Sequence, residues 1–117
     1  MRTIDFTRDA AQPIERFASV AAASLLVGAG TGVTRVHTVY FDAGGEIGAH
    51  AAGFDQLFLV VAGAGWAAGA DGVRVPLTAG RGAVFAKGER HAKGSEVGMT
   101  AIMIQLEALD PDVGARA

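Results

Sequence analysis

The chain has 117 residues, which suits one domain and hardly two. It is 50% hydrophobic and 19% charged, with a mean hydropathy of +0.33, so it can bury a core and does not have the composition of a disordered chain. A net charge of -2 with scattered lysines and arginines argues against nucleic acid as a partner, and the absence of cysteine excludes disulfides, thiolate metal sites and thiol nucleophiles.

Residues 1–23 are expected to form an N-terminal arm, because they begin with a polar, irregular segment that holds at most a first short strand. The uncharged stretch 18–34 is shorter than the roughly 20 strongly apolar residues that span a bilayer. The segment before it mixes acidic and basic residues, unlike a signal peptide. We therefore expect a cytoplasmic protein with no membrane partner.

Short apolar runs separated by glycine-rich breaks follow the arm. They lie at 24–28, 34–41, 55–61, 65–70, 73–77, 82–86 and 99–106. None has helical periodicity, and Asp71-Gly72 between two of them favours a hairpin with a type I′ turn. This pattern predicts an all-β sandwich or barrel. We expect one domain over 1–117, with the barrel at about 24–106 and a short polar tail at 107–117.

The glycine-rich stretch GAGTGV at 28–33 follows an apolar run and could be taken for a dinucleotide fingerprint. That fingerprint requires a helix to follow, whose N-terminus holds the pyrophosphate. The residues that follow are TRVHTVYF, whose β-branched and aromatic content indicates a strand. We therefore expect no nucleotide cofactor.

The polar residues best suited to catalysis or metal binding are histidines that lie in otherwise apolar stretches of the sequence. The chain has three histidines, and His50 lies six residues before Gln56 in a glycine- and alanine-rich segment. His91 follows about forty residues later, after the run GAVFAKGER. Two imidazoles and an amide on separate hairpins form a plausible small metal constellation, although a lone histidine in a β-rich chain is more often a surface residue.

The order and spacing of these residues resemble the two motifs of small single-domain cupins, over about 35–106. The first cupin motif is glycine, five residues, His-x-His, three or four residues, Glu, six residues and glycine. Here Gly44, His50, Gln56 and Gly63 stand at those spacings, with Ala52 at the second histidine.

The second cupin motif is glycine, five residues, Pro-x-Gly, two residues, His, three residues and Asn. Here the sequence has Gly80, Ala86, Gly88, His91 and Ser95 at the corresponding positions. The resemblance implies a double-stranded β-helix, or jelly-roll, barrel. It also implies that the usual site of three histidines and one glutamate is reduced to His50, Gln56 and His91.

Three interpretations of the reduced site remain open. In the first, His50, Gln56 and His91 hold a divalent transition metal (Fe, Ni, Zn, Cu or Mn), with water in the remaining positions. In the second, His50 or His91 acts as the acid or base of a metal-free isomerase or epimerase. In the third, the barrel is a ligand-binding or regulatory module without catalysis. The sequence does not decide whether the protein is an enzyme, and it identifies no catalytic residue.

The resemblance also bears on the pocket and on assembly. Strand alternation places Phe58 and Val60 on the same face as Gln56, and Ala52 and Met103 complete the expected pocket lining for a small-molecule ligand. For each apolar member, plain core packing is the simpler explanation. Because small cupins expose sheet edges, the resemblance implies a homodimer, to which the apolar region 18–34 could contribute.

Overall fold

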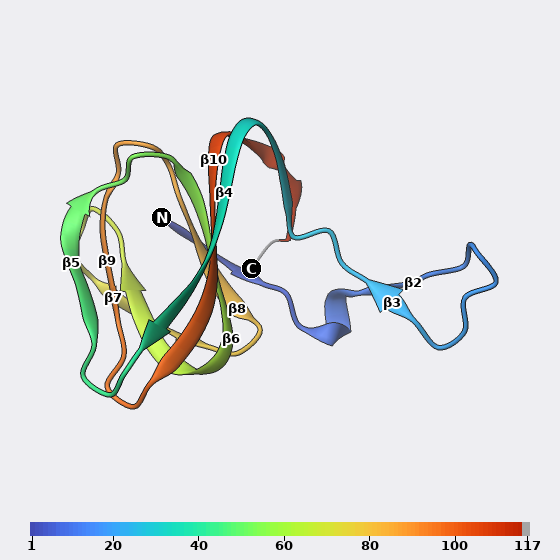
Figure 1. Ribbon diagram of the computed structural model, residues 1–117, viewed down its shortest axis with the longest axis horizontal. Helices are drawn as coiled ribbons and strands as arrows, with labels where there is room; N and C mark the ends of the chain where they lie inside the picture. Colours follow the sequence, from blue (N-terminus) through green and yellow to red (C-terminus); the bar gives the residue numbers. More distant parts are fainter. Residues whose placement is uncertain (116–117) are drawn as a thin grey trace.

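The computed structural model describes residues 1–115 and is built almost entirely of β-strands (Figure 1). A single 3-10 turn, η1 (Arg8–Ala10), interrupts the N-terminal segment. The strands are β1 (Arg2–Asp5), β2 (Gln12–Pro13), β3 (Ala23–Ser24), β4 (Gly28–Phe41), β5 (Glu46–Ala51), β6 (Asp55–Ala68), β7 (Arg74–Thr78), β8 (Arg81–Phe85), β9 (Arg90–Gly94) and β10 (Met99–Gly114). The expected all-β cupin-like barrel is confirmed.

The barrel wall is antiparallel throughout and is organised around β6. One side runs in the order β1-β8-β6-β10-β4. The second half of β6 pairs with β7 and β9, and β9 pairs in turn with β5. The chain can pass from one side to the other because a bulge interrupts the ladder near Gly63, which has a φ of +76° and no room for a Cβ against the Gly98 carbonyl.

Two apolar clusters pack against opposite faces of this wall. The inner cluster holds buried residues from several strands, namely Phe41, Phe58, Val60, Ala67, Leu77, Ala83, Phe85, Met99 and Ala101. The outer cluster is built from the alternate residues of the same strands, such as Leu57 and Leu59, and is covered by residues of the N-terminal segment and the chain end. Strand alternation thus makes both faces of the β8-β6-β10 region apolar.

The observed sheet is larger than the expected range 24–106. Strand β1 lies in the predicted arm and pairs with β8, and β10 continues through the predicted tail to Gly114. The short strands β5 and β9 were not among the predicted runs, because they are poor in β-branched residues. The runs at 55–61 and 65–70 are parts of one strand, β6.

Two local expectations can also be compared with the structure. Asp71-Gly72 does lie in the β6–β7 connection, but only Gly72 has a positive φ, so the turn is not the expected type I′. Instead, the Asp71 carboxylate accepts a hydrogen bond from the Val73 amide at 2.9 Å. The stretch 28–33 is part of strand β4, so the strand–turn–helix context of a dinucleotide fingerprint is not formed there.

The segment between β1 and β4 projects from the barrel as a narrow arm, seen at the right of Figure 1. Its two short strands, β2 and β3, pair only with each other among the described residues. At its tip Phe17 and Val20 are each 86% exposed, and Phe17 has a positive φ. The expected homodimer stays a prediction. Exposed apolar side chains such as these are typical of surfaces that bind another protein.

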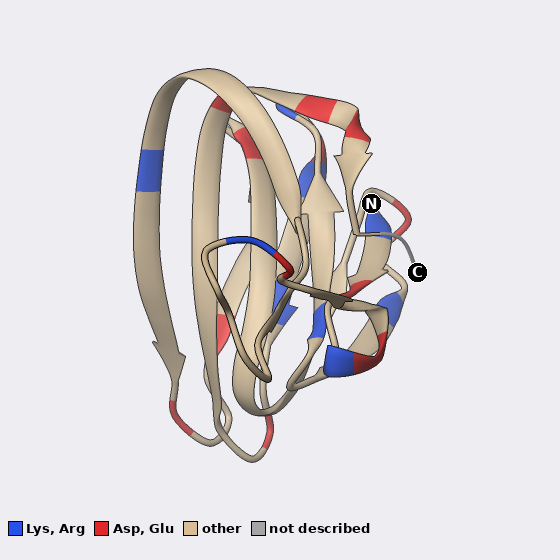
Figure 2. Cartoon of the chain, turned by 90° about the vertical axis from the view of Figure 1, so that its right-hand side faces the viewer, with Lys and Arg blue, Asp and Glu red and all other residues tan. Residues whose placement is uncertain are grey.

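Charged residues are sparse along the barrel strands (Figure 2). The remainder lie in the loops and the N-terminal segment. Within residues 1–115 there is no helix with the length and apolar character needed to cross a membrane.

Candidate functional site

The two motif histidines meet across the β5–β9 ladder. His50 and His91 are direct partners in the antiparallel register, so their side chains point to the same side of the sheet. The ring centroids lie 4.6 Å apart, at an angle of 66°. His91 is only 1% exposed and rests on Phe85, with ring centroids at 4.4 Å, whereas His50 is exposed. The pair therefore connects the interior of the barrel with its surface.

The third motif residue, Gln56, lies in the adjacent wall and binds a residue that the sequence did not single out. Gln56 is 4% exposed, and its side-chain oxygen accepts a hydrogen bond from the Lys93 ammonium. Lys93 is 1% exposed. Its Nζ lies 4.9 and 5.2 Å from the ring centroids of Phe58 and Phe85, within the range of cation–π attraction.

Lys93 is thus the main functional residue that the sequence analysis missed. The signal was available, because Lys93 follows His91 by two positions on a strand, and residues i and i+2 share a face. If His91 points inward, Lys93 must do so as well. Lysine is almost never fully buried without a charged partner, so Lys93 was expected to be a surface residue.

Burial lowers the pKa of both inner basic groups. Desolvation holds the pKa of Lys93 at about 8, against an ordinary value of 10.5. Desolvation, followed by the nearby positive charges of Lys93 and His50, lowers the pKa of His91 from 6.5 to about 4, although Glu89 acts in the opposite sense. At neutral pH the interior therefore contains a neutral imidazole beside a mostly protonated ammonium.

The hydrogen bonds of the two histidines differ. Nδ1 of His50 lies 2.8 Å from the carbonyl oxygen of Gly48. Since a carbonyl only accepts, Nδ1 carries a proton, and in the neutral ring the lone pair is then on Nε2. By contrast, both ring nitrogens of His91 are buried and neither makes a hydrogen bond of good geometry within the described residues, although the nearby Glu89 backbone raises the pKa of the imidazole slightly. A buried polar atom without a partner is costly, which makes His91 an unusual core residue.

A row of polar side chains continues this site along the inner wall. Gln56 stands opposite Gln105, and Gln105 stands opposite Arg35 on β4. In the next inward-facing row, His37 stands opposite Met103. The sequence left open which face of strand 34–41 lines the barrel. Because Phe41 belongs to the inner core, the lining face is the one that carries Arg35 and His37.

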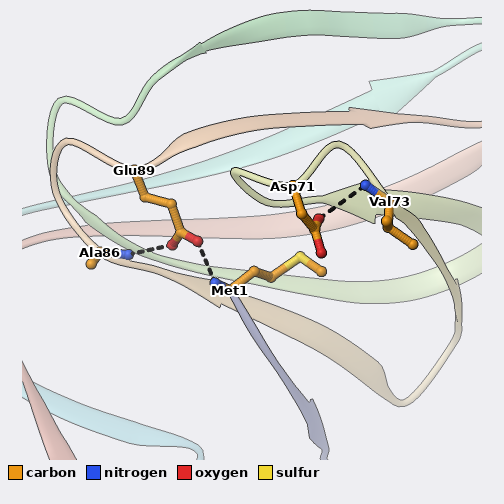
Figure 3. A network of polar contacts seen from close by, with 5 residues as sticks. All are labelled: Met1, Asp71, Val73, Ala86 and Glu89. Atoms are coloured by element: carbon orange, nitrogen blue, oxygen red, sulfur yellow. Dashed lines mark hydrogen bonds and ion pairs between the residues drawn. The ribbon is translucent and has the colours of Figure 1, made fainter.

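The carboxylates nearest to the site are engaged elsewhere. Asp55 accepts hydrogen bonds from the backbone amides of Lys87 and Leu109, at 2.8 and 2.9 Å. Glu89 accepts from the amide of Ala86 and from the amino group of Met1 (Figure 3). Within residues 1–115 no ion pair involves Lys93. The inner wall therefore carries an uncompensated positive charge.

The expected pocket-lining residues occupy different environments. Phe58 and Val60 are completely buried in the inner core. Met103 is partly buried, and its sulfur lies 3.9 Å from the Lys93 Nζ. Ala52 is buried in the β5–β6 connection, where its backbone exchanges hydrogen bonds with Glu89 and Gly88. Of this group, Phe58 and Met103 lie against Lys93.

Ser95, which stands at the asparagine position of the second motif, has a structural role. It is 2% exposed, its hydroxyl donates to the Ala64 carbonyl at 2.6 Å, and it accepts from the Gly98 amide at 2.8 Å. We expect Ser95→Ala to lower the free energy of unfolding by about 1–2 kcal/mol, because two buried backbone groups lose their partner. Urea unfolding would measure this loss. The exposed Ser24→Ala is the matched control, and equal stability of the two variants would contradict the prediction.

The residues do not fit a divalent metal as they are arranged. The Gln56 oxygen, which would be a ligand, is occupied by the Lys93 ammonium. A metal at that oxygen would lie beside a positive charge in a poorly solvated interior, with neutral donors only. Within the described chain no three His, Asp or Glu side chains form a group that could hold a metal ion. The metal set His50, Gln56 and His91 remains a prediction from the motif.

The comparisons with known proteins identify the fold. No family model and no curated protein sequence matches the chain. Among solved structures, an RmlC-like cupin from Shewanella frigidimarina matches with a TM-score of 0.58 and 25% identity, covering 68% of each chain. A cupin superfamily protein from Desulfitobacterium hafniense matches with a TM-score of 0.58 and 14% identity, over 91% of this chain and 98% of that one.

A third structural neighbour is described as a sugar phosphate isomerase of the cupin superfamily from Silicibacter pomeroyi. It matches with a TM-score of 0.53 and 19% identity, over 61% of this chain and 48% of the neighbour. The chain has the fold of a small cupin domain.

Proposed function

We propose that this cupin domain binds a small organic anion inside the barrel, without requiring a metal. The observation that carries the proposal is the buried ammonium of Lys93, which has an amide and aromatic rings around it but no carboxylate. Burying an unpaired charge is expensive, and an anionic ligand would supply the missing partner. A carboxylate or a phosphate monoester has the required charge and acceptor oxygens.

The inner wall supports this ligand class beyond Lys93. Arg35, His37 and His50 are exposed on the side of the site that faces solvent. Strand β4 pairs only with β10, and β5 pairs only with β9, so hydrogen bonds do not close the barrel between these two strands within the described chain. A small anion entering there would meet positive or neutral polar groups before it reached Lys93.

A thermal-shift series would test the proposal. Acetate, benzoate and inorganic phosphate would be compared with the neutral acetamide and benzamide. We expect the anions to stabilise the protein and the amides to have little effect, with a gain that reaches about 2.7 kcal/mol at a hundred times Kd. Equal stabilisation by benzoate and benzamide would show that charge plays no part and would sink the proposal.

The chain offers a well-matched control, because it contains two lysines. Lys93→Met removes the buried charge at similar length, whereas Lys87→Met removes an exposed charge. We expect the first variant to lose the anion-dependent shift and the second to keep it. A shift of unchanged size in folded Lys93→Met would contradict the assigned role of Lys93.

A second candidate, metal-free acid–base catalysis, rests on the geometry of His50. Its Nε2 lone pair is free because Nδ1 donates to Gly48, and its ring is exposed to an incoming substrate. The isomerase among the structural neighbours shares the fold alone at 19% identity. The test is exchange of solvent deuterium into the carbon next to the carbonyl of a ketose phosphate, followed by NMR. Exchange that persists in His50→Ala would exclude His50 as the base.

A further inference from the structure

The barrel contains a built-in cation, the Lys93 ammonium, which is hydrogen-bonded to Gln56. We propose that the Lys93 ammonium takes the place of the divalent metal for which the histidine–glutamine motif is spaced, and that it keeps metal ions out of this barrel. Removing Lys93 would then turn the site into a metal site.

The first support is the use that Lys93 makes of a motif donor. Gln56 stands at the glutamate position of the first motif, and its oxygen would face the metal. That oxygen accepts a hydrogen bond from the Lys93 Nζ. Because both side chains are almost fully buried, solvent cannot readily replace either partner. The ammonium therefore satisfies the acceptor that a metal would otherwise need.

The second support is charge. The donors of the predicted site are two neutral imidazoles and one amide, so the site brings no negative charge to offset a divalent cation. Lys93 adds one positive charge to the same interior. Lys93 is almost fully buried, and no carboxylate forms an ion pair with it within residues 1–115. In a poorly solvated interior, like charges at short distance repel strongly.

The third support is what would remain if Lys93 were absent. Neither ring nitrogen of His91 makes a hydrogen bond of good geometry within residues 1–115, and in neutral His50 the Nε2 lone pair is left for a ligand because Nδ1 donates to Gly48. The two rings are already adjacent, with centroids 4.6 Å apart. Truncating Lys93 would release the Gln56 oxygen and vacate space beside these donors. Two imidazoles and an amide with room for water form a reasonable site for a borderline metal ion.

The experiment measures metal binding to the protein after chelator treatment and desalting. Co²⁺ is titrated into the wild type, Lys93→Ala and Lys87→Ala, followed by visible absorption and by calorimetry. We expect Lys93→Ala to bind one Co²⁺ at least about tenfold more tightly than the wild type, because a buried like charge has been removed. Lys87→Ala should behave as the wild type.

Two further variants keep the outcome decisive. In Lys93→Ala/His91→Ala the gained binding and its visible band should be lost, which places the metal at His91. Lys93→Met removes the charge and preserves the packing volume, so it reports the effect of charge if Lys93→Ala fails to fold. Near-stoichiometric tight binding by the wild type would overturn the proposal. So would a folded Lys93→Met and a folded Lys93→Ala that bind Co²⁺ no better than the wild type.

Discussion

Lys93→Met should make the protein more stable by about 2 kcal/mol at pH 7. Burial lowers the pKa of Lys93 from 10.5 to about 8, which means that the folded state pays about 3 kcal/mol to keep the ammonium charged. Methionine has a similar length, carries no charge and suits the contacts with Phe58 and Phe85. The Gln56 oxygen loses its donor, which returns about 1 kcal/mol of the gain.

The measurement is urea unfolding at pH 7, supported by thermal melts. For a chain of this size the gain corresponds to a rise in Tm of about 8 °C. Lys87→Met, which changes an exposed lysine, should alter stability by no more than about 0.5 kcal/mol. The double variant Lys93→Met/Gln56→Met should be at least as stable as Lys93→Met, because it also removes the amide left without a donor. A less stable Lys93→Met would show that the buried ammonium is well compensated.

The same comparison has a pH signature. The unfolded lysine titrates near 10.5 and the folded one at about 8. Between these values the unfolded state binds more protons, so the free energy of unfolding of the wild type rises with pH across this window. The advantage of Lys93→Met should therefore be complete below pH 8 and should shrink toward pH 10.5. An advantage that stays constant over this range would point to packing rather than charge.

Acidification should destabilise the fold through His91. Its pKa falls from 6.5 in the unfolded chain to about 4 in the folded protein, first because it is buried and then because Lys93 and His50 lie close by. Between pH 6.5 and 4 the unfolded state binds more protons, so stability falls as the pH is lowered. The full cost below pH 4 is about 3 kcal/mol.

Urea unfolding of the wild type and of His91→Leu at a series of pH values would test this. The difference between the two profiles removes the contribution of the carboxylates, which both proteins share. His91→Leu should be less sensitive to pH than the wild type between 6.5 and 4, whereas the exposed Ser24→Ala should follow the wild-type curve. Lys93→Met should raise the pKa of His91, since it removes one of the charges that depress it. This shift can be followed by NMR of the imidazole. Parallel pH profiles for the wild type and His91→Leu would refute the assignment.

Both predictions describe groups that weaken the fold where they lie. Removing an unpaired buried lysine, or a histidine whose ring nitrogens lack partners, should be an easy route to a more stable protein. Perturbed titratable groups that gather in one interior are a characteristic of functional sites. This is consistent with the proposal that an anionic ligand binds at Lys93.

The sequence by itself determined the class of fold and part of the site. Strands and turns could be predicted from its short apolar runs and glycine breaks, because the two-residue period of a strand and the turn preference of glycine act within a few residues. The spacing of two motifs located His50, Gln56 and His91. The sequence could not show that the runs at 55–61 and 65–70 form one strand, since the bulge at Val61 and the close approach of Gly63 to Gly98 arise from pairing with the distant strand β10.

Only the tertiary structure decided which face of each strand is interior, because that depends on what packs against it. Packing of Phe41 into the inner core turned Arg35 and His37 toward the barrel. The β5–β9 register put His50 against His91 and turned Lys93 inward toward Gln56. A lysine reads locally as a surface residue, and its burial emerges only when strands distant in sequence close around it. That long-range closure places a positive charge at the centre of the site.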